Sequence, residues 1–260
     1  MQRHDGRNYD ELRNITIHAD SFGYAPSSVL VQVGKTKVLC SVTLQQGVPP
    51  FLRGKGGGWL SAEYAMLPTA TGERTARATA ASGYNGRSIE ISRFIGRALR
   101  SIVDLRVLSD YTIIVDCDVL QADGGTRTAS ISGACLALLR AEQTWLSSKL
   151  FKSPFVTDIV AAVSVGVLNN ACVLDPSYQE DSCGQADFNF VIARSGGIIE
   201  LQGGGEKGPV SWDLFMQVQT LARKGVEQWF YVLDQGGKNS VSYNNHVALF
   251  SLQNRLQSVS

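Results

Sequence analysis

A pair of glycines followed by hydroxyl and guanidinium side chains is the stretch of this sequence whose residue types point most directly to chemistry. Gly124 and Gly125 follow a strand-like run, and Thr126, Arg127 and Thr128 open a helix-like segment. Glycines let backbone N–H groups approach a ligand closely, and a helix N-terminus supplies unpaired donors and the positive end of the helix dipole. The arginine adds a bidentate fork that matches phosphate. These features predict a phosphate-sized anion site, and the alternative is a plain glycine turn beside a surface arginine.

A second candidate is a pair of carboxylates separated by a short stretch of chain. Asp181 lies in an acidic connection beside Glu180, and Asp187 begins an alternating run in which Asp187 and Asn189 share the face opposite the core. Two carboxylates can share Mg²⁺, which binds one or two of them together with phosphate oxygens. One carboxyl can instead act as a general acid on a leaving oxygen. A solvated acidic loop is the alternative.

Basic residues are concentrated in one segment of a nearly neutral chain. The net charge is +1, yet residues 51–106 hold nine Lys/Arg and four Asp/Glu, whereas the remainder holds 15 and 19. This asymmetry indicates a polyanionic partner, and such side chains on glycine-rich loops suit a phosphate backbone bound without reading base sequence. Arg87 directly precedes a helix and could complete the anion site, while a solvated or subunit-facing surface is the alternative for the helical arginines. The basic candidates are Arg53, Lys55, Arg74, Arg77, Arg87, Arg93 and Arg97.

The composition excludes several classes of protein. The chain has 260 residues, of which 44% are hydrophobic and 18% charged, enough to build a large core rather than a disordered chain. Its 26 glycines and seven prolines follow no collagen period. No apolar run reaches the roughly 18 residues of a membrane span, and residues 1–13 lack the apolar run of a secretory signal. We therefore expect a soluble cytoplasmic protein without membrane association, whose five cysteines are buried free thiols.

The elements that must position these residues alternate between strands and helices. Strands are expected over 14–19, 28–33, 36–44, 59–66, 111–121, 157–168, 171–174, 187–194 and 198–201. Helices are expected over 88–105, 126–149 and 210–233, the first from its apolar stripe at helical spacing. Residues 68–87 and 175–186 are expected to be loops. This order predicts an α/β or α+β fold with mixed sheets, formed by residues 1–235 and followed by a polar tail over residues 236–260.

Taken together, several stretches resemble the ribonuclease PH family of phosphorolytic exoribonucleases. The longest and most specific stretch is Asp116–Ser130, which contains the glycine pair. Shorter matches run from the N-terminus to about residue 230. They are Arg3-His-Asp-Gly-Arg7 with Asp10-Glu-Leu-Arg13, Val48–Gly54, Ala62–Pro68, Gly86–Arg93 with Ile95-Gly-Arg97, Glu180-Asp-Ser182, Asp187, and Gln202-Gly203.

The resemblance implies a fold, an assembly and a reaction. Members of the family pair two βαβα-type halves in one chain. They resemble polynucleotide phosphorylase cores and exosome ring subunits. They form rings, usually hexamers built as trimers of dimers. The implied reaction is attack of inorganic phosphate on the 3′-terminal phosphodiester of tRNA precursors and other RNA 3′ ends. It releases a nucleoside diphosphate, and the reverse reaction adds nucleotides. The enzyme would thus be a tRNA nucleotidyltransferase that uses Mg²⁺ or Mn²⁺.

The resemblance also assigns roles to individual residues. The phosphate site falls on Arg87, Gly125, Thr126 and Arg127. The catalytic and metal-binding positions fall on Asp181 and Asp187, with Asp181 as a general acid. The RNA-binding positions fall on Arg74, Arg77 and Arg93.

Two positions depart from the family pattern, and two other functions are kept as alternatives. Thr69 stands where relatives commonly carry a loop arginine, and Gly184-Gln185 replaces Ala-Glu between the two aspartates. The first alternative is a non-catalytic RNA-binding ring subunit, against which the presence of both arginines and both aspartates argues. The second is a small-molecule phosphotransferase, which would require ATP rather than free phosphate.

Overall fold

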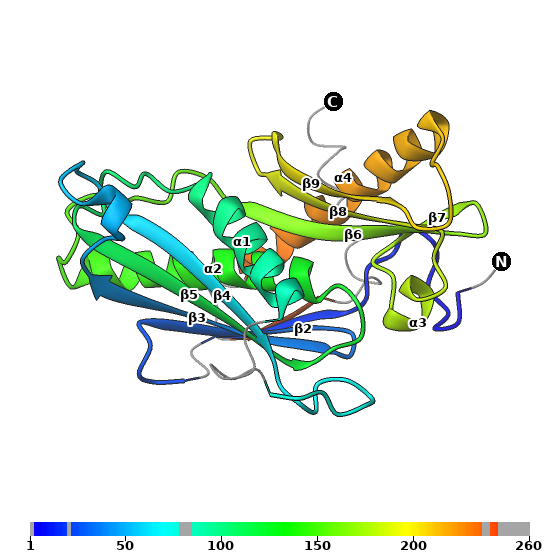
Figure 1. The fold of residues 1–260 in the computed structure, drawn as a ribbon, viewed down its shortest axis with the longest axis horizontal. Helices are drawn as coiled ribbons and strands as arrows, with labels where there is room; N and C mark the ends of the chain where they lie inside the picture. Colours follow the sequence, from blue (N-terminus) through cyan, green and yellow to red (C-terminus); the bar gives the residue numbers. More distant parts are fainter. Residues whose placement is uncertain (1–2, 20–21, 78–84, 236–239, 244–260) are drawn as a thin grey trace.

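The computed structural model describes residues 3–19, 22–77, 85–235 and 240–243, which form two sheets with helices packed between and over them (Figure 1). The first sheet has the strand order β10-β1-β2-β3-β5-β4, and the second has the order β7-β6-β8-β9. The first sheet is antiparallel except for the parallel pair β4 and β5, so it is mixed, while the second is antiparallel throughout. The expected α/β class is confirmed.

The first half of the chain builds most of the first sheet and its two helices. Gly34 forms the tight turn between β2 and β3 with a left-handed φ of +57°, as the sequence predicts. Helix α1 is the crossover between the parallel strands β4 and β5. The elements are β1 (Ile15–Ala19), β2 (Ser27–Val33), β3 (Thr36–Gln46), a 3₁₀ turn (Pro50–Leu52), β4 (Trp59–Met66), α1 (Gly86–Arg100), β5 (Tyr111–Gln121) and α2 (Thr126–Ser147).

The second half contributes the second sheet and its covering helix. Its elements are β6 (Val160–Leu168), β7 (Ala171–Leu174), α3 (Tyr178–Asp181), β8 (Ala186–Ala193), β9 (Ile198–Gly205), α4 (Trp212–Gln235) and β10 (Ser240–Tyr243). Strand β10 returns to the first sheet and pairs with β1. Four residues of the polar tail therefore extend a sheet that the first half builds. The rest of residues 236–260 lies outside the described part of the chain.

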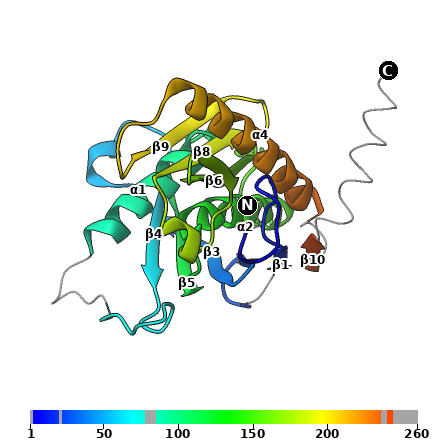
Figure 2. The same cartoon turned by 90° about the vertical axis from the view of Figure 1, so that its right-hand side faces the viewer.

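Helix α2 is the central element, because it contacts both sheets. It packs against β2 and β3 on one side and β6 on the other, and an unbroken run from Thr128 to Leu138 is buried. Strand β6 in turn lies between two helices (Figure 2). Ser164 faces Thr128 of α2, and Val163 faces Gly225 of α4. Burial on both faces explains why β6 has a continuous apolar sequence, whereas β3, buried on one face, alternates.

Both ends of helix α1 and the segment over residues 175–186 differ from the sequence expectations for identifiable reasons. Helix α1 begins at Gly86, because the Asn85 side chain accepts a hydrogen bond from the Arg87 N–H at 3.0 Å and caps it. It ends at Arg100 rather than at residue 105, since the chain then leaves to bridge Val103 with Val156. The expected loop over 175–186 contains the one-turn helix α3.

Candidate functional site

The N-terminus of α2 presents unpaired backbone donors beside two arginines. Gly125, the residue before the helix, has a left-handed φ of +64° and provides no side-chain cap. The first-turn N–H groups of α2 therefore keep the capacity to bind an anion. The Thr126 hydroxyl is fixed by the Tyr64 hydroxyl at 2.8 Å. The Arg127 guanidinium is oriented by the Gln202 side-chain oxygen, to which Nη1 donates at 3.2 Å, and by Glu90 at 3.5 Å.

Arg87 faces the same region from a second helix N-terminus. It lies in the first turn of α1 and is exposed. Burial raises the pKa of the Tyr64 hydroxyl, and the charges of Arg87 and Arg127 partly offset this rise. Both arginines also act on the Asp181 carboxylate. The predicted phosphate residues Arg87, Gly125, Thr126 and Arg127 are thus brought together around two helix N-termini.

The two aspartates approach this cluster from the second half of the chain. Asp187 is the half-buried second residue of β8, and its Oδ2 accepts a hydrogen bond from Asn189 Nδ2 at 2.8 Å. Burial and repulsion from Asp181 raise the pKa of Asp187 to about 6, against the opposing effects of Asn189 and Arg127. Desolvation and repulsion from Glu206 raise the pKa of Asp181, which ends α3. Asp181 is therefore close enough to Asp187 to disfavour its ionisation.

This electrostatic arrangement fits a divalent cation that also contacts a phosphate. Within the described part of the chain, no group of three or more His, Cys, Asp or Glu side chains is arranged as a self-sufficient metal site. Mg²⁺ typically takes only one or two carboxylates and completes its shell with water and substrate phosphate. A cation between Asp181 and Asp187 would remove the mutual repulsion that raises the pKa of Asp187. The pair thus suits a metal that is bound together with substrate.

The predicted RNA-binding arginines lie outside this cluster. Arg74 and Arg77 are exposed in the loop after β4, which both views show projecting from the body of the protein. Arg93 is exposed on α1 and lines a cavity of about 420 Å³ between α1 and β4. The same cavity is lined by Tyr64, whose hydroxyl contacts Thr126 of the anion site. Arg97, another basic candidate, is instead paired with Glu200 of β9 at 2.5 Å.

Four residues of the site carry roles that the sequence did not assign. Tyr64 and Gln202 hold Thr126 and Arg127, while Asn189 and Glu206 modulate the aspartates. Asn189 could have been found, because it shares a strand face with Asp187. Gln202 and Glu206 are far from Arg127 and Asp181 in sequence, so no local pattern connects them. Gln185, which departs from the family pattern, bonds Asn170 in the β6–β7 turn.

Comparisons with known proteins agree with this geometry. Two models of the 3′ exoribonuclease family match, domain 1 over residues 11–143 and domain 2 over residues 158–225. The ribonuclease PH of Bacillus velezensis is 48% identical over 226 residues, covering 86% of this chain and 92% of that protein. The ribonuclease PH of Bacillus subtilis is 47% identical over 227 residues, covering 87% and 93%. The chain belongs to the ribonuclease PH family.

A solved structure carries the same fold as this ribonuclease PH family member. A chain of the Archaeoglobus fulgidus exosome with RNA bound to the active site superposes with a TM-score of 0.74, at 24% identity, covering 88% of this chain and 92% of that one. The domain 1 match ends at residue 143, near the end of the central helix α2, and the domain 2 match begins at residue 158. Each half of the family fold therefore contributes one side of the site, with arginines from the first and aspartates from the second. None of the described helices is long and apolar enough to cross a membrane.

Proposed function

We propose that the site formed by the two helix N-termini and the aspartate pair performs phosphorolysis of RNA 3′ ends. As a member of the ribonuclease PH family, the chain is a phosphate-dependent 3′-to-5′ exoribonuclease, a tRNA nucleotidyltransferase. The observation that carries the assignment of the site is that Arg127 acts electrostatically on both Asp181 and Asp187. A phosphate-binding guanidinium and a carboxylate pair in one place are what this reaction needs.

In this mechanism the protein aligns and neutralises the reacting phosphates. The guanidinium groups of Arg87 and Arg127, the Thr126 hydroxyl and the N–H groups after Gly125 hold inorganic phosphate for in-line attack on the terminal phosphodiester. The new bond joins phosphate oxygen to phosphorus, and the bond from phosphorus to the 3′ oxygen of the preceding nucleotide breaks. The products are a nucleoside diphosphate and an RNA shortened by one nucleotide. No covalent enzyme intermediate is required.

The aspartates have two tasks in the proposal. Asp181 donates a proton to the leaving 3′ oxygen, a role supported by its raised pKa. Asp187 and the unprotonated oxygen of Asp181 would together hold Mg²⁺ or Mn²⁺, which would supply positive charge at the scissile phosphate. Asn189 keeps the Asp187 carboxylate oriented toward Asp181 by its hydrogen bond at 2.8 Å.

The RNA is proposed to reach the site along α1 and β4. Arg93 and Tyr64 line the same cavity, and Arg74 and Arg77 lie exposed on the loop after β4. These arginines would bind the backbone of tRNA precursors and other RNA 3′ ends without reading sequence. We propose that the chain acts in the cytoplasm as a hexameric ring, a trimer of dimers. Membership in the family and the fold shared with the exosome chain support this assembly.

The reaction is tested by incubating RNA with the protein and Mg²⁺, with and without inorganic phosphate, and resolving the small products. Release of nucleoside diphosphates only when phosphate is present is the expected result. Monophosphates released without phosphate would mean hydrolysis and would contradict the role of Arg127. Binding without shortening would favour the non-catalytic ring subunit, and a requirement for ATP would favour the phosphotransferase.

Two substitutions separate the proposed roles within the site. Arg127→Ala should raise the KM for phosphate at least about tenfold or abolish turnover, because a bidentate contact to the nucleophile is lost. Asp187→Asn should suppress turnover while RNA binding, measured by filter retention, is largely kept. Unchanged phosphorolysis kinetics in folded Arg127→Ala, or wild-type rates of Asp187→Asn across a Mg²⁺ titration, would contradict the corresponding assignment.

A further inference from the structure

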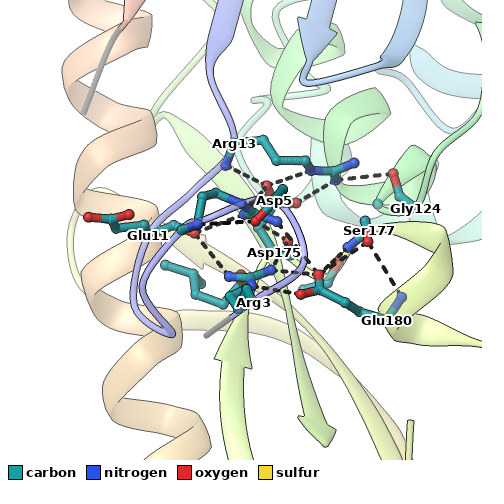
Figure 3. Close-up of polar contacts among 12 residues, drawn as sticks. Arg3, Asp5, Glu11, Arg13, Gly124, Asp175, Ser177 and Glu180 are labelled. Carbon is teal, nitrogen blue, oxygen red and sulfur yellow. Dashed lines mark hydrogen bonds and ion pairs between the residues drawn. The ribbon is translucent and has the colours of Figure 1, made fainter. Parts of the chain in front are cut away.

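The segment from Arg3 to Arg13 carries an ion-pair network that reaches both sides of the proposed site (Figure 3). Its basic members pair with two carboxylates of the second half, Asp175 and Glu180. Arg3 and Arg13 are each 6% exposed, Asp175 is 5% and Glu180 is 8% exposed. Buried charges are retained only where partners and hydrogen bonds compensate them, so the geometry here is tightly specified.

Arg13 holds the glycine turn that precedes α2. Its Nε and Nη2 donate to the two carboxylate oxygens of Asp175 at 2.9 and 2.6 Å. The same guanidinium donates to the backbone carbonyls of Asp123 and Gly124, the latter at 3.3 Å. A Cβ built on Gly125 would lie 3.1 Å from Arg13 Nη2. Arg13 therefore packs directly behind the peptide groups whose N–H donors face the phosphate site.

Asp175 is itself held in an unfavourable backbone conformation. Its φ is +50°, in the left-handed region that non-glycine residues adopt at a cost of about 1 kcal/mol or more. Although burial opposes ionisation, the Arg13 guanidinium lowers the pKa of Asp175 below its usual range. The backbone N–H of Arg13 also donates to Asp175 Oδ2 at 2.9 Å. Through Arg13, this pairing connects the end of β7 to the glycine turn.

Arg3 holds α3, the four-residue helix that ends in Asp181. Its Nε and Nη2 donate to Glu180 Oε1 and Oε2 at 2.8 and 2.7 Å. Glu180 also accepts from the Ser177 N–H at 2.9 Å, completing a capping box with the Ser177 hydroxyl. Hydrogen bonds from Arg3 and Ser177 overcome the effect of burial and lower the pKa of Glu180 to about 2. A helix of one turn is unstable alone, so Arg3 and the capping box determine where Asp181 lies.

The ion pairs Arg13–Asp175 and Arg3–Glu180 are connected to each other as well as to the site. Arg3 Nη2 donates to the Asp175 carbonyl at 3.1 Å, and Arg7 lies 3.6 Å from a carboxylate oxygen of both Asp175 and Glu180. The glycine turn meets α3 directly, since a Cβ on Gly124 would lie 2.6 Å from the carbonyl oxygen of Pro176. The network therefore spans the junction between the phosphate side and the aspartate side.

We propose that Arg13 and Arg3 are positioning residues for two different parts of the reaction. Arg13 sets the glycine turn that binds the phosphate nucleophile, and Arg3 sets the helix that carries Asp181. This inference rests on the proposed function of the site. If the two arginines only stabilised the fold, substituting either one would affect kcat and the KM for phosphate alike. Positioning predicts instead that Arg13 affects the KM for phosphate and that Arg3 affects kcat.

The test compares Arg13→Lys with Arg3→Lys in the full chain. Lysine keeps the charge but loses the planar fork that bonds a carboxylate and backbone carbonyls together. With RNA saturating, Arg13→Lys should raise the KM for phosphate about tenfold and leave kcat within about twofold, because only nucleophile binding is disturbed. Arg3→Lys should lower kcat about tenfold and leave the KM for phosphate within about twofold. Phosphate binding measured by calorimetry without RNA should weaken in Arg13→Lys only.

Arg106→Lys is the matched control. Arg106 makes a bidentate pair with Asp104 at 2.9 and 2.8 Å, but this pair is exposed and contacts neither the glycine turn nor α3. Arg106→Lys should change neither kcat nor the KM for phosphate. If a lysine variant of the network fails to fold, Asp175→Asn and Glu180→Gln take the places of Arg13→Lys and Arg3→Lys, with the same expected split.

The outcomes separate this inference from the function on which it rests. Equal losses in kcat from both variants, or kinetics like the wild type after correction for the folded fraction, would overturn the positioning roles. A wild-type chain that releases no nucleoside diphosphate would instead overturn the proposed function. A split in the expected directions in an active wild-type background supports both.

Discussion

Asp187 illustrates how a single side chain of the site is placed at a cost to the fold. Its carboxylate is half-buried and close to Asp181, which raises its pKa to about 6. At neutral pH the folded protein therefore contains an ionised group that would ionise more easily in the unfolded chain. A raised pKa of an acid destabilises the fold above that pKa, and the effect disappears as pH falls toward the ordinary value near 4.

We expect Asp187→Asn to stabilise the metal-free protein at pH 8. After allowance for partial exposure the gain should be about 1–2 kcal/mol, which corresponds to a rise of about 5 °C in Tm. An asparagine oxygen can still accept the hydrogen bond from Asn189. The gain should shrink strongly by pH 4.5, where Asp187 of the wild type is mostly protonated. Thermal melts with chelator at both pH values measure it.

Asp104 provides the control, because its pKa is lowered whereas that of Asp187 is raised. Hydrogen bonds from Arg106 lower its pKa to about 2, so Asp104→Asn should give no stabilisation at pH 8. A difference in Tm between wild type and Asp187→Asn that is the same at pH 4.5 and pH 8 would argue that Asp187 is not destabilised by ionisation.

At the scale of elements, the site depends on a close approach between a turn and a helix. Gly124 has a φ of +80°, and the backbone of Pro176, Ser177 and Tyr178 occupies the space where a side chain would begin. The glycine turn of the first half and α3 of the second half are therefore in backbone contact. Their separation fixes how far the phosphate site lies from Asp181.

Gly124→Ala should destabilise the protein and suppress phosphorolysis. Both effects should exceed the cost of a left-handed φ, because the new methyl group would also clash with the backbone of residues 176–178. Gly56 is the matched control, since its φ is +73° and a Cβ there would meet nothing within 4 Å. Gly56→Ala should cost about 1 kcal/mol for its backbone conformation and leave activity unchanged. Urea denaturation and the rate of nucleoside diphosphate release measure both effects. Equal effects at the two positions would show that the contact with α3 tolerates a methyl group.

The elements also show what local sequence could and could not predict. Strand β4 begins and ends at the predicted residues, because its alternation reflects burial on one face. Helix α3 was predicted as loop, since four residues carry no helical period and its formation depends on Ser177, Glu180 and the distant Arg3. The predicted phosphate and aspartate residues do converge. Their local motifs indicated this chemistry, whereas Gln202 and Glu206 enter the site only through tertiary folding.

At the scale of the whole molecule, the two halves share one core. Buried apolar side chains form a continuous cluster that includes residues of both sheets and of the helix α2 between them. The pair Arg97–Glu200 and the hydrogen bond from Arg127 to Gln202 also join the halves at the surface. Neither half can separate without exposing α2, so we expect the protein to unfold as one unit.

This expectation is tested with fluorine-labelled tryptophans followed by NMR through a urea titration. Trp59 lies in β4 of the first half, and the buried Trp229 lies in α4 of the second. Their transitions should share one midpoint. Leu138→Ala, at a fully buried position of α2, should lower that midpoint equally for both, with a loss of about 2–5 kcal/mol. The half-exposed Leu150→Ala is the control, and separate midpoints for the two tryptophans would contradict a shared core.

The distribution of the five cysteines has a practical consequence for following this enzyme. Cys40, Cys117, Cys135 and Cys172 are buried. The hydrogen bond to Cys40 together with burial raises the pKa of Cys117, and burial raises the pKa of Cys135 and Cys172, so these thiols resist alkylation in the folded protein. The expectation of five buried thiols is wrong for Cys183, which is exposed and lies two residues after Asp181. A maleimide dye should therefore attach at one chosen place beside the reaction centre without any engineered cysteine. The four buried thiols become reactive only when the folded chain opens. Their labelling rate would therefore report how often the native enzyme opens.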